Sequence, residues 1–509
     1  MTQQPATRGT GRRAGVLVLR LGGLVALGAL AGLGQAPWAL WPLTLAALTV
    51  AFFLHARATR PRAAFGMGWA LGLGYFLLTL HWIMQPFQVD AARDGWMAPY
   101  ALALMAGGLA LFWGVGWALA QRWRPAGALA LVAAWTLAEV ARSVLFTGFP
   151  WALIGHVWIG TPLAQLAAFV GPHGLTLLTL LGAAALAQAG RRSFVLAALP
   201  VVAGAVAWPL LDPGPAPAPD ATLPLVRMVQ PNAPQDQKWN PDMADVFYNR
   251  LLDATAASPA PDLVVWPETA LPYLLEYATP AFETISDLSR GAPVVLGINR
   301  REGSRYYNAL VVLGRGAQVL AIHDKAHLAP FGEYIPFGDW FARFGIHGLA
   351  ASEGGGFSAG RVGDVLDIPG IGPALALICY EGIFAEEVGA YTRRPRLMVL
   401  ITNDAWFGTD AGPQQHLAQE RLRAIEQGLP MVRVANTGIS AMIDAKGRIT
   451  ASLPLGAEGG LDARLPPALP PTLYARWGDW TALVMLILVS LAALFARPRF
   501  SIDPRRARQ

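Results

Sequence analysis

In three segments of this sequence, an apolar run is followed by a side chain that could take part in covalent chemistry. They are "LVVWPETALP", which contains Glu268, "HDKAHLAPFGEYIPF", which contains Lys325 and Glu333, and "ALALICYEGIF", which contains Cys379. Cys379 is the only cysteine among 509 residues, so an intramolecular disulfide is excluded. Taken singly, each residue has an ordinary structural explanation, because a lone cysteine is commonly a small buried hydrophobe and a lone glutamate or lysine commonly faces solvent.

Taken together, Glu268, Lys325 and Cys379 supply the three functions that acyl transfer through a cysteine needs. A thiol becomes a strong nucleophile when it loses its proton, and a carboxylate can accept that proton. An ammonium group can stabilise the negative charge that develops on the oxygen of an attacked carbonyl. All three residues lie at or near the ends of predicted strands, where α/β folds usually build their sites. The pattern therefore predicts one Glu–Lys–Cys site.

The elements that must position this site lie at 222–465, where charged, apolar and turn residues are mixed. Short runs rich in valine, isoleucine and leucine, such as "APVVLGINR" and "RLMVLITND", predict strands. Two stretches have apolar residues at helical spacing, and one of them, "QQHLAQERLRAIEQG", places His416, Gln419 and Glu420 on a polar side. Alternating strands and helices predict an α/β domain.

The rest of the chain is much more apolar. The whole sequence is 54% hydrophobic and only 14% charged, whereas about 25% charged residues is typical of soluble proteins. Runs of about 20 apolar residues are typical of transmembrane helices. We therefore predict a polytopic membrane bundle of about eight transmembrane helices, with the α/β domain inserted before the last of them. The predicted spans are roughly 14–34, 37–54, 64–84, 97–120, 126–146, 163–188, 193–211 and 481–495.

Arginine residues concentrate in alternate loops of this bundle, which orients it. Because positively charged loops stay in the cytoplasm, both termini are expected there and the α/β domain on the opposite, periplasmic face of a Gram-negative inner membrane. The arginines that set this orientation are Arg8, Arg12, Arg13, Arg57, Arg60, Arg62, Arg122, Arg124, Arg191, Arg192, Arg497, Arg499, Arg505, Arg506 and Arg508. The predicted parts are a bundle at 1–211, a Pro-rich linker at 212–221, the catalytic domain at 222–465, a last span at 479–497 and a basic cytoplasmic tail at 498–509.

Two charged residues, Glu139 and Arg142, lie inside the fifth predicted span. They are three residues apart, so they share a helix face and can form an ion pair. Because charge inside a membrane is costly and often functional, a contact with the active site is the alternative to a structural pair. The aromatic "FTGFPW", Phe146 to Trp151, follows and is typical of an interfacial anchor.

In chain order, "WPE", "DKAHLAPFGEYIPF" and "CYE" resemble the Glu–Lys–Cys motifs of the nitrilase, or carbon–nitrogen hydrolase, superfamily. "KWNP", "FTGFPW", "NDAWFG" and "QHLAQERLRAIEQGLPMVRVANTGIS", together with the predicted spans, are similar to its membrane-bound branch, the apolipoprotein N-acyltransferase family. The resemblance covers nearly the whole chain and shows no departure at the triad. It implies an αββα sandwich for the inserted domain.

The resemblance also implies roles for individual residues. Glu268 would be the general base, Lys325 the oxyanion stabiliser and Cys379 the nucleophile. From the residues alone, Trp239 could equally be a core anchor and Glu381 a salt-bridge partner at the strand end. The positions for which the resemblance implies supporting or substrate-binding roles are Glu333, Trp239, Tyr380 and Glu381.

The reaction implied by the resemblance is ping-pong acyl transfer. The sn-1 acyl chain of a phospholipid would pass through a thioester on Cys379 to the N-terminal amine of a diacylglyceryl-cysteine lipoprotein. We expect a monomer, and we expect no cofactor or metal, because the chain has no H-E-x-x-H zincin motif and no P-loop. Nucleic acid is not expected as a partner, since no basic patch interleaved with aromatic residues occurs in the α/β domain. The alternatives are a membrane-tethered nitrilase-type amidase that uses water, and a non-enzymatic polytopic scaffold or transporter, against which the complete triad argues.

The segment 337–360 lies between Lys325 and Cys379 and combines aromatic residues near its start with three consecutive glycines. Aromatic side chains favour the head-group level of a membrane, and glycine relaxes the backbone. We predict a mobile arm whose aromatic tip reaches the outer leaflet and which borders the active site. A loop packed on the α/β core is the alternative.

Overall fold

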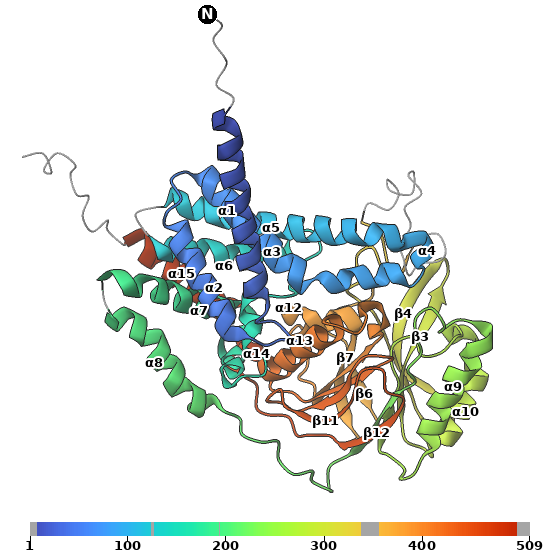
Figure 1. Cartoon of the computed structure of the whole chain (residues 1–509). Helices are drawn as coiled ribbons and strands as arrows, with labels where there is room; N and C mark the ends of the chain where they lie inside the picture. Colours follow the sequence, from blue (N-terminus) through green and yellow to red (C-terminus); the bar gives the residue numbers. More distant parts are fainter. Residues whose placement is uncertain (1–7, 124–126, 193, 337–355, 496–509) are drawn as a thin grey trace, which may run out of the picture.

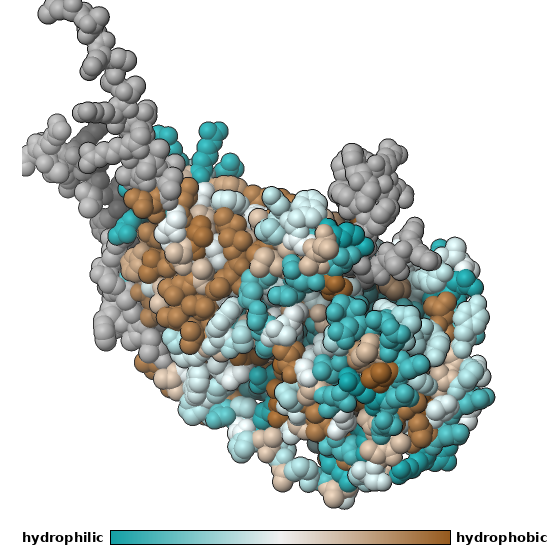
Figure 2. All heavy atoms as spheres, turned by 45° about the vertical axis from the view of Figure 1, so that its right-hand side comes forward, coloured by the Kyte–Doolittle hydropathy of each residue, from teal (hydrophilic) through white to brown (hydrophobic). Residues whose placement is uncertain are grey.

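The structure is a computed structural model that describes residues 8–123, 127–192, 194–336 and 356–495. Apolar helices form one part of the molecule and two β-sheets form the other (Figure 1). The last long helix, α15 (Trp480–Phe495), returns to the helical part and packs on α6 and α7. Figure 2 shows hydrophobic residues gathered over the helical part and mostly hydrophilic residues over the α/β part.

Every range in which the sequence predicts a span contains an apolar helix. By length and composition, two helical segments among the described residues can cross a membrane, Ala91–Arg122 and Pro162–Gln188; a third is possible if Pro61–Thr79 and His81–Gln88, bent by 47°, form one span. The predicted number of about eight spans is therefore not confirmed. Several helices are shorter than the roughly 20 residues needed to cross a bilayer; α2, for example, has 15 residues. The main helices of this part are α1 (Arg8–Gly32), α2 (Trp41–His55), α3 (Pro61–Thr79), α5 (Ala98–Arg122), α6 (Ala128–Val144), α7 (Ala167–Arg192) and α8 (Phe194–Leu211).

Small residues let the helices of the bundle approach closely. A side chain at Gly74 of α3 would collide with the backbone of Val25 in α1, so only glycine fits at this crossing. On its other side α3 faces α5, where Trp113 and Trp117 are fully buried. Trp113 meets Trp135 of α6 edge-on, with ring centroids 4.9 Å apart. The bundle is therefore held by backbone contact on one side and by tryptophan packing on the other.

The α/β part consists of two six-stranded sheets. In each sheet three adjacent strands run parallel, β1–β2–β3 in the first and β7–β8–β9 in the second, and antiparallel strands flank them. The first sheet has the order β12 (Gly459–Arg464), β1 (Leu225–Gln230), β2 (Leu263–Val265), β3 (Val294–Glu302), β4 (Arg305–Leu313) and β5 (Val319–Asp324). The second has the order β11 (Ile449–Leu453), β10 (Ser440–Ile443), β9 (Met431–Ala435), β8 (Leu397–Thr402), β7 (Gly372–Ile378) and β6 (Val365–Ile368).

Side chains alternate between the two faces of each strand, so that each sheet packs against the other sheet on one face and against helices on the other, in a four-layer sandwich. Val265 of β2 and Ile378 of β7 lie in the core between the two sheets. Val264 faces the opposite way and packs under α9 (Pro241–Ala256) and α10 (Thr279–Leu288). Leu377 likewise faces outward, toward α13 (Gly412–Gln427). Because side chains alternate between the faces of a strand, both sheets bury both faces, and the expected αββα arrangement is present.

Helix α13 lies between the second sheet and the helical bundle. Leu422 and Ile425 pack against Val157 and Trp158, which precede α7 in the chain. The predicted polar side of this helix, with His416, Gln419 and Glu420, is consequently buried rather than in water, at 0%, 2% and 0% exposure. Hydrophobic periodicity could not show this, because the second covering layer comes from a distant part of the chain.

Two predictions fall mainly outside the described residues. The arm at 337–360 is described only at 356–360, so its aromatic residues Trp340, Phe341 and Phe344, and the neighbouring Ile346, are not among the described positions. The basic tail at 498–509 also lies outside them. Both remain predictions.

Candidate active site

Strand ends bring the three predicted catalytic side chains together. Glu268 follows β2 and Lys325 follows β5 in the first sheet, whereas Cys379 follows β7 in the second. All three are buried, with 5%, 2% and 7% exposure. Residues separated by more than a hundred positions along the chain therefore meet at one edge of the sandwich, where the two sheets face each other.

Lys325 lies between two carboxylates. Its ammonium nitrogen Nζ is 3.3 Å from Oε1 of Glu268 and 2.9 Å from Oε1 of Glu333. The other carboxylate oxygen of Glu333 accepts a hydrogen bond from the backbone N–H of Ala329 at 2.8 Å. Glu333, predicted as a supporting residue, thus holds Lys325 in place beside Glu268.

Burial and charge determine the protonation of the site. Burial raises the pKa of the Cys379 thiol well above its usual range; Glu268 adds to the rise, and Lys325 opposes it. Burial would lower the pKa of Lys325, but the carboxylates of Glu268 and Glu333 outweigh it and hold that pKa well above its usual range. The thiol is therefore protonated and the lysine charged at neutral pH, so that a base must remove the thiol proton before Cys379 can attack.

Two asparagines that the sequence analysis did not single out orient Glu268. Nδ2 of Asn308, in β4, donates to Oε1 of Glu268 at 2.7 Å and to Oε1 of Glu333 at 3.2 Å. The backbone N–H of Asn403, directly after β8, donates to Oε2 of Glu268 at 2.7 Å. The sequence does mark both asparagines, because each is a polar residue within or directly after an apolar strand. It does not show which residue each asparagine contacts.

Comparisons with known proteins show to which family this chain is similar along most of its length. Residues 27–185 match the apolipoprotein N-acyltransferase N-terminal domain, and residues 225–469 match the carbon–nitrogen hydrolase domain. An apolipoprotein N-acyltransferase of Rhodopseudomonas palustris is 37% identical, covering 92% of this chain and 94% of the relative. One of Bradyrhizobium diazoefficiens is 39% identical, covering 93% and 94%. The chain belongs to the apolipoprotein N-acyltransferase family. Among solved structures, an amidase from Nesterenkonia sp. is 18% identical with a TM-score of 0.36, covering 50% of this chain and 94% of that one.

Glu381 connects the turn that contains Cys379 with the segment that contains Lys325. Its Oε2 accepts from the backbone N–H of Ile378 at 2.6 Å, and its Oε1 accepts from that of Ala326 at 2.7 Å. His323 Nε2 lies 3.3 Å from Oε2, and Nδ1 of the same ring lies 3.0 Å from Asp364. Glu381 therefore joins residues next to Cys379 with residues next to Lys325, and it is also a salt-bridge partner of His323 at the strand end.

The His323–Glu381 pair predicts a pH dependence of stability. Burial would lower the pKa of His323, but Glu381 and Asp364 raise it from 6.5 to about 9. Since the folded pKa lies above the ordinary one, the stabilisation is fully present below pH 6.5 and is lost as the pH rises through about 9. We expect the apparent melting temperature to fall between pH 7 and pH 10, and to fall less in His323→Gln. Equal slopes in the two proteins would contradict the assigned pair. Other groups that titrate in this range are common to both proteins, so the difference isolates His323.

Tyr380 is buried beside Cys379 in an aromatic group. Its ring meets Phe384 edge-on at 5.0 Å, and the imidazole of His327 stacks on Phe384 at 3.7 Å. This group lies in the core that the bundle shares with the α/β part. Tyr380 thus lies where the catalytic turn meets the helices of the family's N-terminal domain.

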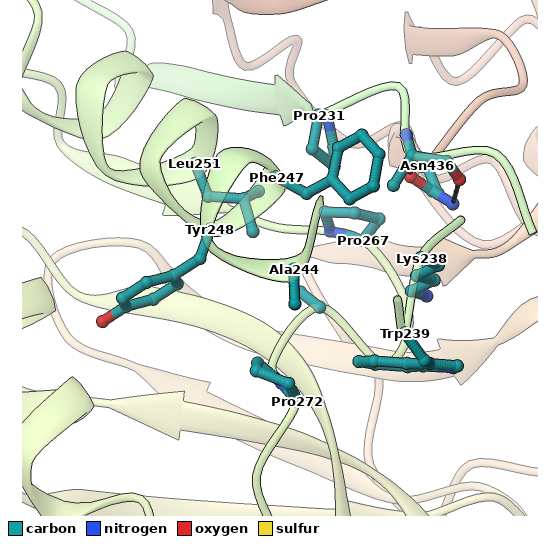
Figure 3. Close-up of a pocket in the computed structure, with 12 residues that line it drawn as sticks. Pro231, Lys238, Trp239, Ala244, Phe247, Tyr248, Leu251, Pro267, Pro272 and Asn436 are labelled. Carbon is teal, nitrogen blue, oxygen red and sulfur yellow. Dashed lines mark hydrogen bonds between the residues drawn. The ribbon is translucent and has the colours of Figure 1, made fainter. Parts of the chain in front are cut away.

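Trp239 lies at a small pocket on the outer side of Glu268. It is 44% exposed, so it is not a buried core anchor. Figure 3 shows its ring beside Lys238, whose Nζ lies 5.0 Å from the ring centroid and donates to the backbone oxygen of Glu268 at 3.2 Å. Burial lowers the pKa of Lys238 to about 8. Trp239 is therefore connected to Glu268 through Lys238, which contacts both residues. The pocket is lined by Pro231, Ala233, Lys238, Trp239, Ala244, Phe247, Tyr248, Leu251, Pro267, Ala270, Pro272 and Asn436.

Glu139 and Arg142 form a fully buried ion pair in α6, with Arg142 Nε 2.7 Å from Glu139 Oε1. The guanidinium also donates to the backbone oxygens of Phe149, Trp151 and Ala152 at 2.7, 2.9 and 3.1 Å. Of the two roles left open by the sequence, the structure favours the structural one, because the pair folds the segment after α6 rather than contacting Glu268, Lys325 or Cys379. Trp151 at the end of "FTGFPW" is buried, so it is not exposed at an interface.

The described residues hold no group of three or more His, Cys, Asp and Glu side chains arranged to bind a metal ion. The groups that act on the Cys379 thiol are the carboxylates of Glu268 and Asp404, the ammonium group of Lys325 and the side chain of Thr402. Their chemistry is that of acid–base and covalent catalysis.

Proposed function

We propose that this protein is an apolipoprotein N-acyltransferase that transfers the sn-1 acyl chain of a phospholipid, through a thioester on Cys379, to the N-terminal amine of a diacylglyceryl-cysteine lipoprotein. The observation that carries the proposal is the convergence of Glu268, Lys325 and Cys379 at one edge of the sandwich, in a chain that matches the family along nearly its whole length. The proposal rests on the buried, protonated thiol and the fixed lysine beside it.

In the first half-reaction, Glu268 accepts the proton of the Cys379 thiol as sulfur attacks the ester carbonyl. A C–S bond forms, and the electron pair of the C=O bond moves to the oxygen, where the charge of Lys325 stabilises it. The tetrahedral intermediate then expels the glycerol oxygen, to which Glu268 returns the proton. The products are the thioester and a lysophospholipid.

In the second half-reaction, a neutral amine attacks the thioester carbonyl. Lys325 again stabilises the oxyanion, and Glu268 accepts a proton from the attacking nitrogen. The C–S bond breaks, the amide leaves, and the thiolate regains its proton from Glu268. One site thus serves both halves in a ping-pong sequence.

The helical part gives this chemistry access to lipid substrates. Both proposed substrates are anchored in a bilayer, and the cysteine turn packs directly on the bundle through Tyr380, Ile383 and Phe384. We assign the catalytic domain to the periplasmic face of the inner membrane, with both termini in the cytoplasm, from the distribution of arginines in the loops. A monomer suffices, since Glu268, Lys325 and Cys379 all come from one chain.

A transfer assay distinguishes this function from that of an amidase that uses water. Purified protein is incubated with a phospholipid radiolabelled in its sn-1 chain and with a diacylglyceryl-cysteine peptide. We expect label in the peptide as an amide, together with stoichiometric lysophospholipid. Release of the label as free fatty acid, with none in the peptide at any peptide concentration, would contradict the proposal and favour the amidase.

Asn308 offers a test of how Glu268 is oriented. In Asn308→Ala the two carboxylates lose a shared donor, and a hydrogen bond to a charged group contributes about 1.5–3 kcal/mol. We expect the rate of transfer to fall about 10- to 100-fold. The exposed Gln318 provides the control, and Gln318→Ala should retain normal transfer. An Asn308→Ala protein as active as the control would show that this amide does not orient the base.

A further inference from the structure

The backbone at Cys379 has an unusual conformation. Its φ angle is +52°, in the left-handed region that residues with a side chain rarely adopt. Such a conformation persists only where surrounding contacts impose it, and it is frequent at active sites. It ends β7 abruptly and begins the short helix η9 (Cys379–Ile383), so it sets the direction in which the thiol points. The contacts that impose it are therefore part of the catalytic arrangement.

The side chain that reaches the backbone of Cys379 is His416 in α13. Its Nε2 lies 3.3 Å from the carbonyl oxygen of Cys379 in hydrogen-bond geometry. The same nitrogen is 2.9 Å from Oε1 of Glu420. That contact is an ion pair, and Oε1 of Glu420 has no hydrogen-bond partner among the described residues. The N–H of this nitrogen is thus directed at the carbonyl of the nucleophile.

His416 belongs to a quartet of buried charged side chains, Asp404, His416, Glu420 and Arg433, each with 0% exposure. Nδ1 of His416 is 3.0 Å from Asp404 Oδ1, and Arg433 Nη2 is 2.7 Å from Asp404 Oδ2 and 3.1 Å from His416 Nδ1. Arg433 Nε also pairs with Glu420. Two acids and two bases balance in charge when the imidazole is protonated. Burial opposes this state, but Glu420 and Asp404 raise the pKa of His416 to about 9.

The helical bundle covers this quartet. Trp151 stacks on the imidazole of His416 with centroids 5.7 Å apart and planes 23° apart, and its Nε1 donates to Gln415 at 2.7 Å. Phe407 meets the same imidazole edge-on at 5.5 Å. Since Arg142 holds the backbone of Trp151, the buried ion pair of α6 contributes to this cover. Water is thereby kept from the bond between His416 and Cys379.

We propose that His416 is a positioning residue for the nucleophile: its Nε2–H donates to the carbonyl oxygen of Cys379 and holds the left-handed turn that aims the thiol. His416 transfers no proton in either half-reaction, and its catalytic relevance rests on the proposed function, in which Cys379 forms the thioester. The quartet supplies the charge that strengthens the hydrogen bond from His416 to Cys379, and Trp151 shields this bond from water.

Two variants matched in charge test the bond by kinetics. His416→Gln and His416→Leu both remove the imidazolium, but only glutamine keeps an N–H that can donate to the carbonyl. For thioester formation we expect kcat to fall about ten-fold or more in His416→Leu, with less loss in His416→Gln and an unchanged KM for phospholipid. Gln414 lies on the same helix as His416, and its amide donates to the backbone oxygen of Thr409, which precedes the helix; Gln414→Leu should match the wild type. Equal kcat values for the two His416 variants would overturn the proposal.

The lone cysteine also allows a direct measurement that does not depend on activity. Cysteine labelled with ¹³C at the carbonyl marks one carbonyl in the whole chain. With ¹⁵N-histidine, solid-state NMR of the unmutated protein in lipid bilayers should show a dipolar coupling between this carbonyl and an imidazole nitrogen, and His416→Gln should weaken it. Absence of the coupling in the unmutated protein would overturn the proposal even if the variants fail to fold. If the coupling is present but no thioester forms, the positioning holds and the proposed function fails.

Discussion

Replacing Cys379 by alanine or serine is expected to reduce acyl transfer to the uncatalysed background. Alanine has no nucleophile. Serine has a much less acidic and less nucleophilic group, and among the described residues His416 contacts the backbone carbonyl at position 379 rather than the side chain. The thiol is 7% exposed and contributes little packing volume, so both variants should fold. The measurement is the initial rate of label transfer from phospholipid to the lipopeptide.

The structural control for this prediction is the apparent melting temperature, which should stay close to that of the wild type in both variants. Near-normal transfer by either variant would remove Cys379 from the mechanism. If both variants lost transfer only together with the fold, the thiol would be a core residue rather than the nucleophile.

Replacing Lys325 by alanine is expected to slow thioester formation by about 10²–10³, because the oxyanion loses its stabilising charge. The same change leaves Glu268 and Glu333 buried without their shared cation, so stability should also fall. Lys325→Arg should be impaired as well, since a planar guanidinium does not fit a place built for a compact ammonium between two carboxylates. Single-turnover kinetics with phospholipid alone measure this step separately from amine attack.

The exposed Lys446 provides a matched control, and Lys446→Ala should retain both activity and stability. Glu268→Gln should stop thioester formation while keeping the packing of the site, because the amide has nearly the same shape but does not accept the thiol proton. Normal single-turnover rates in Lys325→Ala would contradict the role assigned to Lys325, whatever the melting temperature.

The sequence singled out candidate site residues more readily than their surroundings, and the catalytic roles of these residues stay predictions. Glu268, Lys325 and Cys379 were identifiable because each follows an apolar strand, and strand ends converge in α/β folds. Asn308 and Asn403 escaped notice because their partners depend on how two sheets face each other, which no local pattern records. His416 was assigned to a polar helix side, but the bundle covers that side, so this histidine is buried and contacts the backbone of Cys379.

In the helical part, the sequence predicted where the helices lie but not how long they are. Apolar runs located the main helices of the bundle, yet run length alone did not determine which helices are long enough to cross a bilayer. The helices α3 and η1 are bent by 47° relative to each other, and α7 is interrupted at Gly171, which has non-helical backbone angles and is followed by Pro172. The role of Glu139 and Arg142 was likewise open, because an i, i+3 spacing shows that two side chains can pair but not that the pair also binds three carbonyls of the following segment.

The most direct test of the proposed mechanism is intact-protein and peptide mass spectrometry after incubation with a phospholipid of defined sn-1 chain and no acceptor. The mechanism predicts one adduct with the mass of that acyl chain, located on Cys379, released by neutral hydroxylamine and lost on addition of a diacylglyceryl-cysteine peptide. Glu268→Gln should show no adduct under the same conditions. An adduct on another residue, or normal transfer to the peptide with Cys379 never acylated during turnover, would contradict it.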